Sequence, residues 1–407
     1  MSVTARDGST VRLHTLTMVA EDDGVMIGRP ETGSYAVFPE EGAEALRLLG
    51  SGATVADVAA WYERTCGEQL DMEDFLDALD DLGFLRTQDD VPEEAAPVTV
   101  RWQRLGRWTF SRPAWLCYGL LFAAAVGFMA GDPALRPSYH RLLFTSHISL
   151  IPITLFVAAV PCILIHEAFH ALAGRRLGLP STLGIGRRLY YLVAETRMDT
   201  LLSVERRRRY LPFLAGMLAD TVLVSVLTLA SVALTRLGTP AWIPALCLAI
   251  AFTCVLRIVW QFMFYLETDL YYVLTNALSC TDLQNATRFH LRALVRRLLR
   301  RAPPTADTDW SAHDLAMARR YAPILVSGYG FSLASLAWAA VPTAVYFWST
   351  AIDRFTTAGT PLADRLDAVF FVAFTSFEIS LLVYVTVRDR RAKSRTAAPA
   401  SRQGAPA

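Results

Sequence analysis

The sequence predicts a multi-pass α-helical membrane protein with a small N-terminal cytosolic α+β domain. Of the 407 residues, 53% are hydrophobic and only 19% are charged, and the mean hydropathy is +0.31. Soluble globular domains carry about 25% charged residues, so a single soluble domain is excluded.

The charge is also divided along the chain. Residues 1–98 contain 21 Asp and Glu against 6 Lys and Arg, whereas residues 99–407 contain 17 against 33. Net charges of −15 and +16 indicate two physically different parts.

Residues 1–90 are expected to form the α+β domain, with a winged-helix-like arrangement. Val25–Gly28 and Ser34–Phe38 have the pattern of two short strands. Three helical stretches follow, at about 41–50, 54–66 and 72–82. The second begins at Thr54, a residue type that caps helix N-termini. The third places an apolar stripe on one helix face, formed by Phe75, Leu76, Leu79 and Leu82. Residues 91–112 are expected to be a linker.

Residues 113–387 are expected to contain about six transmembrane helices. About 20 helical residues cross a hydrocarbon core of about 30 Å, and six apolar runs reach that length. They lie at about 114–131, 148–173, 211–235, 241–266, 322–348 and 367–387. With a cytoplasmic N-terminus, the inside segments that flank these runs hold 26 Arg and Lys, and the outside loops hold 5. This bias follows the positive-inside rule and predicts a plasma-membrane protein with both termini in the cytoplasm. Residues 388–407 are predicted to be a disordered basic tail.

The segment Arg288–Arg301 places apolar residues among six arginines. Its apolar positions Leu291, Leu294, Val295 and Leu298 follow the helical period. This pattern is typical of a helix that lies on an anionic membrane leaflet. An ordinary solvated basic loop is the alternative.

The second apolar run contains His166, Glu167 and His170 in the pattern H-E-x-x-H. On a helix the two histidines lie one turn apart on the same face, so both can bind Zn²⁺, and Glu167 can act on a water molecule as general base. His and Glu side chains are costly in hydrocarbon. A metal site is therefore favoured over a cluster that only holds helices together.

A third ligand is needed, because catalytic zinc usually has three protein ligands. The remaining histidines lie outside the apolar runs or at their ends. The cytoplasmic end of the fourth run offers two carboxylates at a suitable depth, Glu267 and Asp269.

The stretches HEAFHALAG, FLAGMLAD and TDLYYVLTNAL together resemble the site-2-type intramembrane zinc metalloproteases, and most closely their peptide zinc metalloprotease branch. The resemblance covers residues 145–300. It implies that His166, His170 and Asp269 hold Zn²⁺ and that Glu167 is the general base of a zinc endopeptidase. Thr268, Leu270 and Asn276 replace the Leu, Gly and second Asp of the family pattern LDGYYALTD, and FLAGMLAD lacks the Pro that usually follows its Gly.

Residues 12–86 resemble PqqD-type peptide-recognition domains, through SYAVFPEEGAEALRLLGSGATVADV and the later DFLDALDDLGFL. This resemblance implies that the domain binds the leader of a ribosomally synthesised, modified precursor peptide as an added strand. A winged-helix-like domain with another partner is the alternative. The other partners expected are membrane lipids and a peptide-modifying enzyme or transporter. No nucleic-acid partner is expected.

The leading functional prediction is therefore a membrane-embedded zinc endopeptidase that removes the leader from a peptide precursor. An alternative substrate is a membrane-anchored regulator, although the chain has no PDZ-like or CBS-like insertion. An alternative class is a non-proteolytic peptide-binding, export or self-protection component with a structural metal. Such a component would not need Glu167 beside its ligand.

Three further charges lie inside apolar runs at a similar depth, namely Asp220, Arg257 and Glu378. Each would be costly unpaired in hydrocarbon. We expect them to form an ion cluster that ties three helices together. The alternative is a catalytic Arg257, which would stabilise an oxyanion or orient Asp269.

Overall fold

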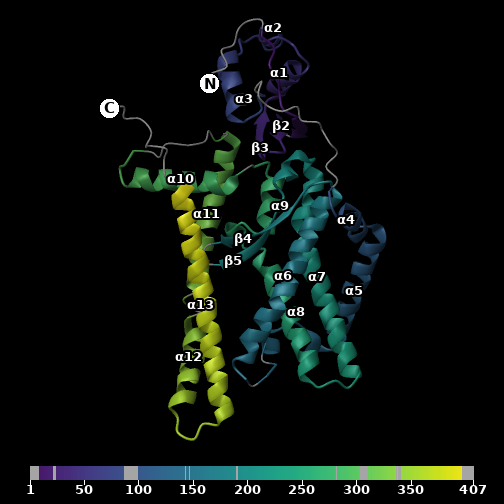
Figure 1. The fold of residues 1–407 in the computed structure, drawn as a ribbon, viewed down its shortest axis with the longest axis vertical. Coiled ribbons are helices and arrows are strands. Elements are labelled where there is room, and N and C mark those ends of the chain that lie inside the picture. The colour runs from purple at the N-terminus through teal and green to yellow at the C-terminus, as the bar shows by residue number, and fades with distance from the viewer. Residues whose placement is uncertain are drawn as a thin grey trace, which may run out of the picture.

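The computed structural model describes residues 9–21, 24–86, 100–142, 144–145, 147–188, 191–280, 282–302, 310, 312–335, 337 and 341–396. These residues form two small sheets and a larger set of helices. The N-terminal unit lies at one end of the long helices (Figure 1). This arrangement agrees with the division of charge along the sequence.

The N-terminal unit is a three-stranded antiparallel sheet with three helices. Its elements are β1 (Thr17–Glu21), β2 (Gly24–Arg29), β3 (Ser34–Phe38), α1 (Glu40–Gly50), α2 (Val55–Cys66) and α3 (Met72–Asp81). The strand order is β1-β2-β3, and Gly28 lies opposite Tyr35. Two predicted strands and three predicted helices are therefore confirmed. The edge strand β1 was not predicted from the sequence.

The apolar stripe predicted for the third helix lies in the core of this unit, with Leu76 and Leu79 buried and Phe75 and Leu82 packed against the core. The fully buried large residues of this core are Ile27, Leu46, Leu49, Leu76, Leu79 and Phe84. The predicted N-cap of α2 is confirmed, because the Thr54 hydroxyl accepts a hydrogen bond from the Asp57 backbone N–H and the Asp57 carboxylate accepts one from the Thr54 N–H. Such a capping box satisfies two backbone donors at once.

Part of the predicted linker is helical. Residues 91–99 lie outside the described residues, whereas α4 (Gln103–Thr109) packs against the end of α6. A Cβ at Gly106 would collide with the backbone oxygen of Leu172 in α6. Glycine at this position therefore permits the close approach of the two helices.

Five helices among the described residues are long and apolar enough to cross a membrane. They are α5 (Arg112–Gly131), α6 (Leu150–Arg176), α7 (Arg206–Arg236), α8 (Trp242–Trp260) and the segment Leu362–Arg388 of α13 (Leu362–Thr396). The structure is thus consistent with a multi-pass membrane protein.

The fifth predicted run, residues 322–348, is described only in part. It contains the end of α11 (Ala312–Ser335) and the start of α12 (Val341–Thr356), and residues 336 and 338–340 lie outside the described residues. The span at this run therefore stays a prediction.

The ends of two helices, α8 and α13, differ from the predicted ranges. α8 ends at Trp260, and the chain then turns through η4 (Phe264–Leu266) into α9 (Asp269–Ala277) and α10 (Leu283–Leu298). α13 continues to Thr396, so residues 388–396 are helical rather than a disordered tail, and residues 397–407 lie outside the described residues. Short 3₁₀ turns complete the connections, namely η1 (Pro133–Leu135), η2 (Tyr139–Leu142) and η3 (Asp199–Ser203).

An unpredicted hairpin joins α6 to α7. Its strands are β4 (Thr182–Arg188) and β5 (Tyr191–Arg197), and Ile185 lies opposite Ala194. In Figure 1 the hairpin extends from the group α5–α8 toward the group α11–α13. Asp367 of α13 connects the same two groups, because its carboxylate accepts hydrogen bonds from the backbone N–H groups of Ile148 and Ser149 at the start of α6.

Candidate metal centre

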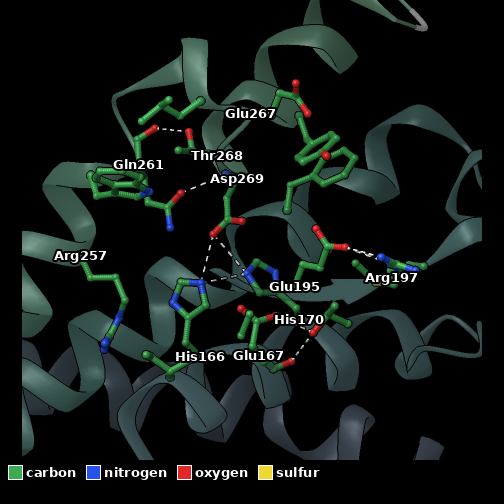
Figure 2. A pocket seen from close by; sticks show the side chains of 18 of the residues that line it. His166, Glu167, His170, Glu195, Arg197, Arg257, Gln261, Glu267, Thr268 and Asp269 are labelled. Carbon is green, nitrogen blue, oxygen red and sulfur yellow. Dashed lines mark hydrogen bonds and ion pairs between the residues drawn. The ribbon is translucent and has the colours of Figure 1, made fainter. Parts of the chain in front are cut away.

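The H-E-x-x-H residues lie together in the C-terminal part of α6. His166, Glu167 and His170 are 5%, 7% and 5% exposed. Their spacing places both imidazoles on one helix face, with ring centroids 4.9 Å apart. All three side chains line a cavity of about 710 Å³ (Figure 2).

Asp269, the first residue of α9, meets the two histidines in this cavity. Its Oδ2 atom lies 3.1 Å from Nε2 of His170 and 3.2 Å from Nε2 of His166. The two Nε2 atoms are 3.2 Å apart. The three residues form a candidate metal-binding triad. Glu267, the other candidate for the third ligand, instead forms an ion pair with Arg288 over 3.2 Å.

The hydrogen-bond partners of the two imidazoles show that the triad atoms directed at one another are all acceptors. His166 Nδ1 lies 2.9 Å from the Asp220 carboxylate, and His170 Nδ1 lies 2.7 Å from the backbone oxygen of Pro212. A carbonyl or an ionised carboxylate only accepts hydrogen bonds, so both Nδ1 atoms donate. In the neutral imidazoles, Nε2 then carries a lone pair directed at Asp269.

Three converging acceptors repel one another unless a cation lies between them. In a tetrahedral zinc site with bonds of about 2.0–2.1 Å, ligand atoms are about 3.3 Å apart. The observed edges of 3.1–3.2 Å fit that spacing. The residues present therefore fit a zinc ion both in geometry and in donor type.

The loop before Asp269 is fixed by Gln261. The Thr268 hydroxyl donates to the backbone oxygen of Gln261 over 2.6 Å, and the Asp269 N–H donates to the Gln261 side chain over 2.9 Å.

The close approach of α7 to the triad depends on Gly216, which belongs to the stretch FLAGMLAD. A Cβ at this position would collide with Nε2 of both His166 and His170. The neighbours Ala215 and Ala219 are fully buried. Small residues here allow the α7 backbone to form one wall of the site.

Thr196 of β5 positions the Glu167 carboxylate. Its hydroxyl lies 2.7 Å from Glu167 Oε2 and 3.1 Å from the Glu167 backbone oxygen. Figure 2 shows Glu167 beside the triad, with Glu195 and Arg197 on the same side of the cavity. No sequence pattern singles out Thr196 or Gln261, because each acts on a site residue from a different element.

The predicted layer of buried charges is present only in part. Arg257 forms an ion pair with both carboxylate oxygens of Asp220, which is fully buried. Glu378 of α13 is half-buried, and within the described part of the chain no hydrogen bond or ion pair reaches it. No hydrogen bond of the described residues joins Arg257 to Asp269 either. Asp220 therefore lies behind His166, whereas Arg257 also lines the cavity.

One departure from the family pattern has a structural explanation. Asn276, which stands where the family pattern has a second Asp, donates a hydrogen bond to the backbone oxygen of Arg206 at the start of α7. This residue thus connects α9 to α7 rather than adding a carboxylate to the site.

Comparison of the chain with protein-family models, with curated proteins and with solved structures gave no match. The fold and the geometry of the site therefore carry the functional argument. The class that they define is a helical protein with five helices long enough to cross a membrane, in which two buried histidines and a partly buried aspartate cluster beside a glutamate.

Proposed function

We propose that this protein is a membrane-embedded zinc endopeptidase that removes the leader from a peptide precursor. The observation that carries the proposal is the convergence of two imidazole Nε2 atoms and one carboxylate oxygen within 3.2 Å, with Glu167 beside them. Bound zinc supplies a Lewis acid that lowers the pKa of water and polarises a carbonyl group.

The remaining steps fall to side chains of this chain. Glu167 accepts the proton of the attacking water and delivers it to the nitrogen of the leaving amine. Thr196 holds the Glu167 carboxylate in one orientation through its hydroxyl hydrogen bond. Asp220 and the Pro212 carbonyl hold the two imidazoles so that Nε2 of each faces the cavity.

The cavity suits an extended substrate. Strand β5 belongs to a two-stranded sheet, so one of its edges has no partner in that sheet, and its residues 194–197 line the cavity. An extended peptide can add to such an edge through main-chain hydrogen bonds. Extension also exposes the scissile carbonyl, which a helical substrate would hide in its own hydrogen bonds.

The N-terminal unit lies where it could deliver such a peptide. Glu21 of β1 forms ion pairs with Arg206 and Arg209 at the start of α7. This contact holds the β1 side of the sheet against the helical part, while β3 is the other edge strand. A leader peptide would add at β3, and the following residues would reach the cavity.

The proposal is tested by zinc content and peptide cleavage measured on the same preparations. The substrate is a quenched-fluorescent library of extended peptides, with products identified by mass spectrometry. Wild type should bind one zinc and cleave, and Glu167→Gln should keep the zinc and lose cleavage. His166→Ala should lose both. Unchanged cleavage by Glu167→Gln, or zinc-independent cleavage by the wild type, would refute the proposal.

A further inference from the structure

Helix α10 has two halves with different surroundings. Its N-terminal half is buried at Leu283, Gln284 and Thr287. Its C-terminal half exposes an apolar stripe, in which Leu294, Val295 and Leu298 are 54%, 53% and 83% exposed. Exposed apolar side chains that gather on one helix face mark an interaction surface.

The charge around this stripe indicates what covers it. Residues 283–302 contain six Arg and no Asp or Glu. In Figure 1, α10 lies across the direction of α11, at the end of the long helices where the N-terminal unit is found. A basic amphipathic helix in this orientation places its apolar stripe among acyl chains and its arginines among phosphate groups.

The buried half of α10 is bonded to the loop that carries Asp269. The Gln284 backbone N–H donates to the Tyr271 hydroxyl over 2.9 Å, and the Gln284 side chain donates to the backbone oxygen of Tyr265 over 3.1 Å. Arg288 pairs with Glu267 over 3.2 Å, and Glu267 has a positive φ of 55°. Non-glycine residues adopt this conformation only where neighbours hold it. α10 thus holds the loop on both sides of Asp269.

We propose that the C-terminal half of α10 binds anionic phospholipid, and that this contact strengthens metal binding at His166, His170 and Asp269 by holding the 265–271 loop in place. The inference rests on the proposed zinc site and adds to it a membrane lipid as regulator. Lipid bound along the exposed half restrains the whole helix. The bonds from Gln284 and Arg288 then transmit that restraint to the third ligand.

The lipid contact is tested by photocrosslinking of the full chain in nanodiscs. A benzoylphenylalanine in place of Leu298 should crosslink to phospholipid in a membrane of equal parts phosphatidylcholine and phosphatidylglycerol. The same probe in place of Glu63, an exposed residue of α2, should not. Crosslinking of position 298 to a second copy or to the N-terminal unit would overturn the proposal.

The coupling is tested by the dissociation constant for zinc, measured by chelator competition. Outer-shell contacts alter metal affinity by about 10–100-fold, so wild type should bind zinc about 10-fold more tightly with phosphatidylglycerol than in phosphatidylcholine alone. The double variant Leu294→Ser/Leu298→Ser should lose this difference in zinc affinity between the two membranes. Arg288→Gln should also lose it, although this variant should still crosslink to lipid. Leu237→Ser, at an equally exposed leucine after α7, should retain it.

The outcomes separate this inference from the proposed function. Equal zinc affinity of the wild type in both membranes, with cleavage intact, overturns the lipid coupling and leaves the endopeptidase proposal standing. Absence of zinc binding in every membrane overturns both.

Discussion

Asp220 of α7 accepts a hydrogen bond from His166 of α6 over 2.9 Å. A carboxylate in this position fixes the tautomer of the imidazole and increases its basicity as a ligand. Arg257 of α8 pairs with the same carboxylate, which connects three apolar helices through one buried acidic group. One contact therefore contributes to both the stability of the bundle and the geometry of the candidate metal centre.

Removal of Arg257 should destabilise the protein. Arg257→Met leaves the fully buried Asp220 charge without its partner, and breaking a buried pair in this way costs about 3–5 kcal/mol. Thermal unfolding in detergent measures the loss. A stable, zinc-loaded Arg257→Met protein that fails to cleave would instead support a catalytic Arg257.

The two roles of Asp220 can be separated with a double variant. Arg257→Met combined with Asp220→Asn removes both charges, so stability should largely return. Zinc affinity should stay about 10–100-fold below wild type, because the amide is a weaker acceptor for His166 Nδ1. Wild-type zinc affinity in Asp220→Asn would show that the contact does not matter for the metal.

Gly216→Ala should abolish zinc binding although it removes no ligand. The added methyl group would occupy the space of both Nε2 atoms, and neither imidazole can move away without leaving the triad. Gly119→Ala in α5 is the matched control, because a Cβ there meets no atom within 4 Å. Zinc stoichiometry and thermal unfolding should be measured for both variants. Full zinc content in Gly216→Ala would show that α7 can shift away from the site.

The features that the sequence predicted are those encoded within a few turns of one segment. His166 and His170 share a helix face through local spacing, Glu167 is adjacent in sequence, and Thr54 caps its own helix. Asp269 lies 99 residues from His170, so spacing alone left Glu267 equally available, and only the family resemblance favoured Asp269.

The contacts that the sequence did not predict come from elements distant along the chain. Thr196, Gln261 and the Pro212 carbonyl each contact a site residue of another element. Hydropathy averages over a window and does not show where a helix ends. For this reason, the end of α8 at Trp260 was placed too late.

The docking of the N-terminal unit should depend on Glu21. This side chain is 6% exposed and pairs with two arginines of α7. Glu21→Gln removes the charge and should increase backbone hydrogen exchange in η3 and in the first turn of α7, without change in zinc content. Glu31→Gln is the control, since the only ion pair of that exposed carboxylate among the described residues lies within the N-terminal unit, with Arg29. Equal exchange in wild type and Glu21→Gln would mean that other contacts hold the unit in place.

The contact between Thr196 and Glu167 offers the sharpest test of the proposed general base. Thr196→Val keeps the shape of the side chain but leaves Glu167 Oε2 without its hydroxyl donor. A hydrogen bond to a charged group contributes about 1.5–3 kcal/mol, so kcat should fall by roughly 10–100-fold. KM and zinc content should stay at wild-type values, because the hydroxyl touches no ligand of the triad. Thr196→Ser restores the donor and should restore most of kcat. Loss of zinc from the Thr196→Val protein would show that the hydroxyl supports metal binding instead. Wild-type kcat in this variant would show that Glu167 needs no orientation from β5.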